Sequence, residues 1–200
     1  MIKNIIFDFG DIFINLDKQV VFKALENKNI QEFLPKYHSI NEEFEVGKID
    51  PQEFVDLLQP DFPHLTSKSI IDIWNSMLLD FPEYRLNFLE NLDKEKKYRL
   101  FLLSNTNALH IPHVSQIMGA ENYRRFKHSF EQFYLSHEIQ LRKPNAEIFQ
   151  YVLDQNNLVP EDTLFIDDTK ENTDAAKKLG IKTWNLQVGV EDVIQLKDKL

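Results

Sequence analysis

The stretch Ile5-Ile6-Phe7-Asp8-Phe9-Gly10 decides the fold of this 200-residue chain. Its apolar first half is typical of a buried β-strand. The carboxylate of Asp8 then stands at the exposed end of that strand, close to a glycine. In open α/β sheets, ligands bind in the crevice at the carboxyl ends of the strands. Asp8 is therefore the first candidate for a functional residue.

Three later stretches add polar groups that suit the same kind of site. Ser104 follows the apolar run 100–103, Lys143 precedes a proline, and the pair Asp167-Asp168 follows the apolar run 164–166. In chain order, the four groups are a carboxylate, a hydroxyl, a cation and an acidic pair. Together they can hold a divalent metal ion and a phosphoryl group.

Composition narrows the function classes. The chain carries 23 basic and 32 acidic residues, a net charge of -9, and no basic run stands out, so we expect no nucleic-acid partner. No apolar stretch approaches the ~20 residues of a membrane span, so we expect no membrane partner. The N-terminal residues lack the layout of a signal peptide, and the absence of cysteine fits a cytoplasmic protein. The oligomeric state is not predicted.

Hydrophobic runs predict strands at residues 5–9, 98–103, 163–166 and 181–184, with a shorter candidate at 133–135. Helical patterns alternate with the later strands. Asn145 can cap one helix, and a helix over 171–179 can end at Gly180. Strands that alternate with helices imply a parallel sheet with helices on both faces. The predicted fold class is therefore α/β, with a Rossmann-like core.

The first two predicted strands are far apart, and the segment between them looks wholly helical. Helix starts are predicted at Asp17, at Ser39 (with Glu42 at capping-box spacing and an end at Gly47), at Asp50 and at Thr66. We therefore predict a core formed by residues 1–15 and 86–200, and an inserted helical cap formed by residues 16–85. An insert directly after the strand that carries Asp8 would hang over the end of that strand as a lid.

Four of these features, in this order and at this spacing, resemble the motifs of the haloacid dehalogenase-like (HAD) hydrolase superfamily. The family's motifs are a strand that ends in a nucleophilic Asp, a strand that ends in Ser or Thr, a Lys often followed by Pro, and an acidic pair after a strand. They match Asp8, Ser104, Lys143 and Asp167-Asp168. The helical insert resembles the family's helical-cap type. Gly10 and the residues around Ser104 and Lys143 resemble a bacterial branch that includes α-glucose-1-phosphate phosphatase.

The resemblance implies Mg²⁺ as the cofactor. Its protein ligands would be Asp8, the backbone carbonyl of Gly10, and Asp168, with Asp167 bound directly or through water. Asn172 resembles a residue that orients the acidic pair.

The resemblance also implies phosphoryl transfer to Asp8, which would form an aspartyl-phosphate that water then hydrolyses. Lys143 would stabilise the phosphoryl charge, and Ser104 and the backbone N–H of Asn105 would bind phosphoryl oxygens. The partner would be a small phosphorylated metabolite.

The chain departs from the family at Gly10, where most phosphatases carry an Asp that acts as general acid and base. Three interpretations follow. We favour a Mg²⁺-dependent phosphatase of a small phosphate monoester with a good leaving group, such as a sugar phosphate. A non-catalytic module that binds phosphate or a sugar phosphate is the first alternative. A metal-independent 2-haloacid dehalogenase is the second, because halide leaves without a proton, but it leaves the acidic pair unexplained.

Other noticeable residues are interpreted structurally. His110 lacks metal-ligand spacing with His113, and Trp74 is expected to pack inside the helical insert. Lys18 is expected to lie on a solvated helix face. The phenylalanines at 126, 130 and 133 are expected in the core.

Overall fold

The computed structural model describes residues 1–20, 23 and 30–200, with the side chains of 30–33 left out. Its centre is a five-stranded parallel sheet in the order β3-β2-β1-β4-β5. The strands are β1 (Asn4–Phe7), β2 (Arg99–Ser104), β3 (Gln132–Leu135), β4 (Thr163–Asp167) and β5 (Lys182–Asn185). The chain builds outward from β1 to one edge and then returns to place β4 on its other side. This reversal of strand order beside β1 is where α/β sheets bind ligands.

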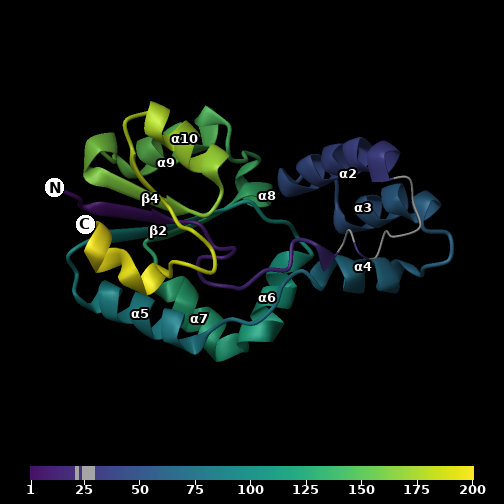
Figure 1. Ribbon diagram of the computed structural model, residues 1–200, viewed down its shortest axis with the longest axis horizontal. Coiled ribbons are helices and arrows are strands. Elements are labelled where there is room, and N and C mark those ends of the chain that lie inside the picture. Colours follow the sequence, from purple (N-terminus) through teal and green to yellow (C-terminus); the bar gives the residue numbers. More distant parts are fainter. Residues whose placement is uncertain (21–22, 24–29) are drawn as a thin grey trace.

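The two faces of the sheet carry separate cores because side chains alternate along each strand. Ile5 and Phe7 of β1 belong to one core and Ile6 to the other. The first core is covered by α5 (Glu83–Lys94), α6 (His110–Met118), α7 (Ala120–His128) and the 3-10 helix η3 (Val193–Lys199), and the second by α9 (Ala146–Asn156) and α10 (Lys170–Lys178), on opposite sides in Figure 1. The predicted α/β class is confirmed.

Local signals set several of the boundaries. Asn145 occupies the N-cap position of α9, as predicted, although its side chain makes no capping hydrogen bond. Gly180 follows α10 with φ +86°, a conformation that glycine adopts without strain. Two short elements complete the core: α8 (Ser136–Ile139) follows β3, and the 3-10 helix η2 (Pro160–Asp162) precedes β4. The phenylalanines at 126, 130 and 133 pack in or against the first core, as expected.

A group of helices lies beyond the carboxyl ends of the strands, at the right of Figure 1, and is called the helical lobe here. It consists of α2 (Ile30–Glu45), α3 (Pro51–Leu58), the 3-10 helix η1 (Gln59–Asp61) and α4 (Ser67–Asn75). Its own core contains Phe44 and Phe54, whose rings stack with centroids 4.3 Å apart, together with Trp74. The division between core and cap at residues 16 and 85 stays a prediction.

Two helix starts in the lobe follow the predicted signals. Asp50 accepts hydrogen bonds from the backbone of Gln52 and Glu53, and Glu53 completes a capping box. Thr66 caps α4 through the backbone N–H of Ser69.

The predicted start at Ser39 is wrong, because α2 already begins at Ile30 and Ser39 lies inside it. The buried stripe of Tyr37, Ile40 and Phe44 extends the helix past this local signal, since burial of an apolar face outweighs one cap. The helix predicted from Asp17 falls partly outside the described residues; Val20 and Lys23 are helical. In the part of the chain that the structure describes, we find no helix with the length and apolar character needed to cross a membrane.

Candidate active site

The sheet brings the predicted acidic residues together. Phe7 lies in register with Leu102 of β2 and Ile166 of β4, so the residues that follow meet at one edge. Asp8 donates its backbone N–H to the carbonyl of Ile166 at 2.8 Å. Carboxylate oxygens of Asp8, Asp167 and Asp168 all lie within 4.8 Å of one another. Such a set of hard oxygen donors fits a Mg²⁺ ion.

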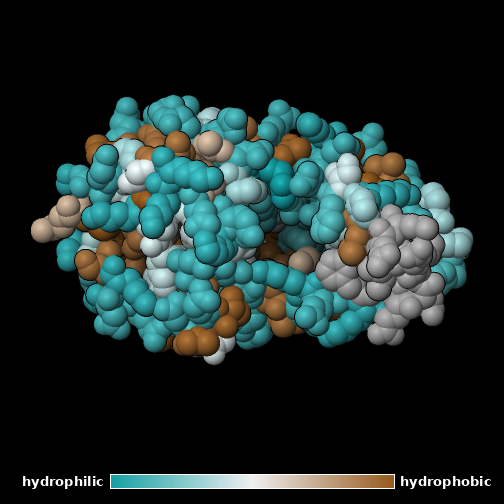
Figure 2. Space-filling model, turned by 45° about the horizontal axis from the view of Figure 1, so that its top comes forward, coloured by the Kyte–Doolittle hydropathy of each residue, from teal (hydrophilic) through white to brown (hydrophobic). Residues whose placement is uncertain are grey.

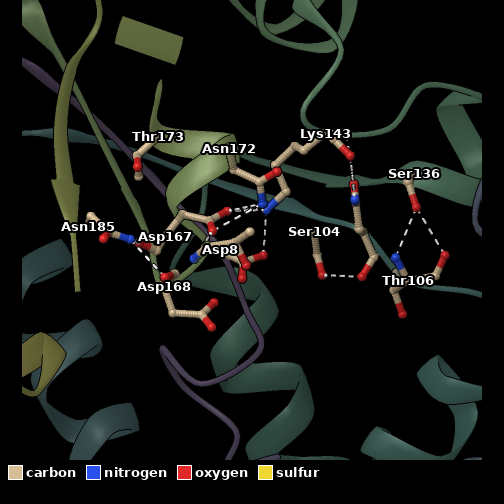
Figure 3. Close-up of polar contacts among 12 residues, drawn as sticks. Asp8, Ser104, Thr106, Ser136, Lys143, Asp167, Asp168, Asn172, Thr173 and Asn185 are labelled. Carbon is tan, nitrogen blue, oxygen red and sulfur yellow. Dashed lines mark hydrogen bonds and ion pairs between the residues drawn. The ribbon is translucent and has the colours of Figure 1, made fainter. Parts of the chain in front are cut away.

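Lys143 neutralises part of this acidic cluster. Its Nζ lies 2.7 Å from Asp8 Oδ1 and 2.7 Å from Asp167 Oδ2, and the side chain is only 1% exposed (Figure 3). Burial lowers the pKa of Lys143, but the two carboxylates outweigh burial and the pKa is raised. The side-chain amide of Asn105 fixes the position of Lys143, because it accepts from the backbone N–H of Lys143 at 2.9 Å and donates to its carbonyl at 2.8 Å. Lys143 is thus a buried, charged cation held between two carboxylates.

Burial has the opposite effect on Asp8. It is the largest cause of a pKa raised to about 7; Lys143 lowers this pKa and the charge of Asp167 raises it. A carboxylate of this kind is poorly solvated and close to a cation, a setting that suits a nucleophile aimed at an anionic ester.

Asp167 and Asp168 have different surroundings. Asp167 accepts from the backbone N–H of Thr169 at 2.8 Å and from the amide of Asn172 at 3.0 and 3.1 Å, in addition to Lys143. These bonds occupy both of its oxygens. The amide of Asn185 donates to the backbone carbonyls of both aspartates at 3.2 and 2.8 Å and orients the turn. Asp168 therefore has the more available carboxylate of the pair.

Lys18 is half-exposed, as a solvated side chain would be, but it lies in a turn and not on the expected helix face, and it contacts Asp168. Its Nζ lies 2.6 Å from Asp168 Oδ2 and 2.9 Å from Asp11 Oδ2. Burial lowers the pKa of Lys18, but the hydrogen bonds to Asp168 and Asp11 outweigh burial and the pKa is raised. Sequence reasoning missed this contact because Lys18 and Asp168 are 150 positions apart and no local pattern links them.

The glycine that replaces the family's acid lies against a leucine. A Cβ added to Gly10 would stand 2.7 Å from Leu16 Cδ1, which is closer than carbon atoms approach without moving. Asp11 does not take over this position: its backbone is left-handed (φ 56°), Oδ1 accepts from the backbone N–H of Leu16 at 3.0 Å, and Oδ2 pairs with Lys18. Leu16 therefore fills the space beside residue 10.

The loop after β2 carries the predicted phosphoryl-binding residues, and hydrogen bonds from Ser136 hold it in place. Ser104 is 3% exposed and lies beside the acidic cluster in Figure 3. Ser136, which sequence reasoning did not single out, accepts from the backbone N–H of Thr106 at 2.9 Å and donates to its carbonyl at 3.0 Å. Because that N–H is engaged, Ser104 and the backbone of Asn105 are the better candidates for phosphoryl binding on this loop.

These residues surround one cavity of about 450 Å³ between the sheet and the helical lobe. Asp8, Gly10, Ser104, Lys143 and Asp168 line its core side. Residues of α2 and α4 line the other side. Figure 2 shows the surface hollowed between the two parts. Its size suits a small molecule held between the sheet and the lobe.

The carboxyl edge of this parallel sheet therefore carries an acidic cluster and a buried lysine, an arrangement that suits phosphoryl chemistry. A family model described as haloacid dehalogenase-like hydrolase matches residues 5–186. This chain belongs to that family.

Among curated proteins, the chain is 28% identical to D-ribitol-5-phosphate phosphatase of Bacteroides thetaiotaomicron, covering 96% of this chain and 95% of that protein. Among solved structures, it resembles a HAD family enzyme of the same species in complex with magnesium and inorganic phosphate (TM-score 0.79, 34% identity, 96% of this chain and 97% of that one). It also resembles a HAD-like family hydrolase from Porphyromonas gingivalis (TM-score 0.81, 31% identity, 100% and 97% covered).

Proposed function

We propose that this protein is a Mg²⁺-dependent phosphatase that hydrolyses a small phosphate monoester through an aspartyl-phosphate on Asp8. The observation that carries the proposal is the buried Lys143, 2.7 Å from both Asp8 and Asp167, next to a cluster in which carboxylate oxygens of Asp8, Asp167 and Asp168 lie within 4.8 Å of one another. The relatives support it, because one is named a phosphatase and another binds magnesium and phosphate. The predicted activity class and cofactor are confirmed by these relatives, and the residue roles stay proposals.

Asp8 acts as the nucleophile in this proposal. A carboxylate oxygen forms a bond to phosphorus while the bond between phosphorus and the ester oxygen breaks, and that oxygen leaves with the electron pair. Water then attacks the aspartyl-phosphate, which releases inorganic phosphate and restores Asp8. Lys143 favours the ionised form of Asp8, because it lowers the pKa that burial raises, and it offsets the negative charge of the phosphoryl group.

The remaining core residues bind and orient. Ser104 and the backbone N–H of Asn105 donate to phosphoryl oxygens. Asp8, Asp168 and the backbone carbonyl of Gly10 would hold Mg²⁺, with Asp167 beside them and oriented by Asn172. When bound, Mg²⁺ supplies positive charge that polarises the phosphoryl group.

Gly10 has no side chain to donate a proton to the leaving oxygen. An anomeric sugar oxygen departs with little help, because it is less basic than an ordinary alkoxide. A polyol phosphate, the kind of compound named for the Bacteroides relative, leaves as a primary alkoxide, so its proton would come from water or another side chain. We further propose that residues 16–85 form a cap that closes over the cavity and excludes water during attack. The cytoplasmic location expected from the sequence also stays a proposal.

The test compares wild type with Asp8→Asn in a phosphate-release assay on sugar and polyol phosphates, with and without Mg²⁺. We expect turnover that EDTA abolishes and added Mg²⁺ restores, and a loss of several orders of magnitude in Asp8→Asn. Asp174→Asn, at an exposed carboxylate of α10, is the matched control and should keep wild-type activity. Equal turnover by Asp8→Asn and wild type would refute the assignment of Asp8 as the nucleophile. Activity on a 2-chloro acid that survives EDTA would instead support a dehalogenase.

A further inference from the structure

The lobe wall of the catalytic cavity carries a polar stripe. Tyr37, Asn41 and Glu45 are spaced four residues apart on α2, so they lie on one face of the helix, and all three line the cavity that contains Asp8. Trp74 of α4 lines the same wall. In the proposed function, residues on the core side of the cavity bind the phosphoryl group. The polar stripe therefore faces the leaving group, which is the alcohol part of the substrate.

A chain of hydrogen bonds fixes the amide of Asn41. Its Nδ2 donates to Glu45 Oε1 at 3.2 Å. Glu45 is held in turn by Arg142 of the core, whose Nε and Nη2 donate to Glu45 Oε2 at 3.2 and 3.0 Å. Because Nδ2 is engaged in this way, the amide presents Oδ1 on its other side. Glu45 is thus a positioning residue for Asn41.

Two polar atoms of this wall are left without partners. Asn41 Oδ1 and Trp74 Nε1 are both buried, and neither has a hydrogen-bond partner among the residues that the structure describes. One atom accepts and the other only donates. Buried polar groups in folded proteins are nearly always hydrogen-bonded, so these two atoms beside an active-site cavity are positions for a ligand or a water molecule to fill. A hydroxyl group can donate to an acceptor such as the first and can accept from a donor such as the second, so a body with several hydroxyls can satisfy both.

The charges around the cavity disfavour a second anion on the substrate. Arg142 is engaged by Glu42 and Glu45, and Lys18 by Asp11 and Asp168. The stripe itself contributes the carboxylate of Glu45. A carboxylate or second phosphate at this wall would therefore meet negative charge and no cation that is free of carboxylates within the described part of the lining.

We propose that Asn41 and Trp74 are specificity residues that bind hydroxyl groups of an uncharged, polyhydroxylated body attached to the phosphate, and that Glu45 positions Asn41. This inference rests on the proposed function and adds to it the substrate class: monophosphates of neutral polyols or sugars. Phosphate esters whose body carries a carboxylate are rejected.

The test is a binding experiment in the Asp8→Asn background with Mg²⁺ present, so that turnover does not interfere. Isothermal titration calorimetry measures the Kd of D-ribitol 5-phosphate and of inorganic phosphate. We expect Asn41→Leu and Trp74→Phe each to raise the Kd of D-ribitol 5-phosphate about tenfold and to leave the Kd of inorganic phosphate unchanged. Trp74→Phe removes the N–H donor together with one of the two fused rings, and it keeps an aromatic ring at the position that stacks on His110 (centroids 5.2 Å apart).

A matched control comes from α4, the helix that carries Trp74. Asn75 also has a buried, unpartnered Oδ1, but it is absent from the described lining of the cavity. Asn75→Leu should therefore leave both Kd values unchanged. If it weakens D-ribitol 5-phosphate as Asn41→Leu does, the effect is not local and the proposal is wrong. It is also wrong if the two test variants weaken both ligands alike, or weaken neither.

The predicted rejection of substrates with a second anionic group is tested with a matched ligand. 5-Phospho-D-ribonate replaces a terminal CH₂OH of the pentitol phosphate by a carboxylate, and we expect it to bind at least about tenfold more weakly. Equal affinity would overturn the rejection of anionic bodies. Absence of turnover in the wild type would refute the phosphatase, whereas these binding results would still decide the role of the polar stripe.

Discussion

The stability of this protein should depend on pH through His110, which joins the core to the helical lobe. The ring stacks on Trp74, and its Nδ1 lies 3.2 Å from Asn107 Nδ2. Asn107 Oδ1 accepts from the backbone N–H groups of Leu109 and His110, which places Nδ2 as a donor toward the ring. Nδ1 must then accept, and Nε2 carries the hydrogen toward the carbonyl of Trp74 at 3.4 Å. Protonation of Nδ1 would set two donors against each other.

Burial is the main cause of a pKa of His110 lowered from 6.5 to about 4; the Trp74 carbonyl raises it and nearby His113 lowers it. Between these values the unfolded chain binds more protons, so the stabilising contribution is complete above the unfolded pKa and is lost as pH falls toward the folded pKa. The difference between the two pKa values sets a ceiling of about 3 kcal/mol. At pH 5 the loss relative to pH 7.5 is about 2 kcal/mol.

Urea denaturation at pH 7.5 and pH 5 measures this loss. We expect wild type to lose about 2 kcal/mol more than His110→Gln does, because glutamine keeps polar contacts but does not titrate. His64→Gln, at an exposed histidine of the lobe, should lose as much as wild type. If His110→Gln and wild type lose equal stability over this range, the interpretation of His110 as a buried neutral histidine is refuted.

Two glycines give further predictions. Gly10→Asp alone should raise kcat on alkyl phosphates less than Gly10→Asp with Leu16→Ala does, because Leu16 Cδ1, 2.7 Å from the new Cβ, has to move aside. The double variant should raise kcat by up to about 10²-fold, and equal kcat for both variants would contradict this. Gly47→Ala should cost more than about 2 kcal/mol in urea denaturation, because φ is +66° and the new Cβ would lie 2.3 Å from the backbone oxygen of His137. Gly189→Ala, at φ +79° with nothing within 4 Å of the added Cβ, should cost only about 1 kcal/mol, and similar losses would show that the contact with His137 is unimportant.

Much of the fold follows from local sequence. The apolar runs before Asp8, Ser104 and Asp167 are long enough to form buried strands, and Gly180 ends α10 as expected. Where a local signal competed with burial, burial prevailed: Ser39 has the spacing of a cap, yet α2 runs through it because its apolar face packs in the lobe. Propensity is a weak energy beside the packing of a helix face.

The site, too, has features that follow from the local sequence and features that do not. The sequence by itself determined which groups end the strands, since a polar residue after an apolar run must emerge at the sheet's edge; that places Asp8, Ser104 and the acidic pair. Only the tertiary structure decided that Lys18 reaches Asp168, that Leu16 fills the space beside Gly10, and that Asn41 faces the cavity with its amide held by Glu45. These contacts depend on how the helical lobe packs over the strands, and the cost of burying charge and leaving polar atoms unpaired is set by neighbours distant in the chain.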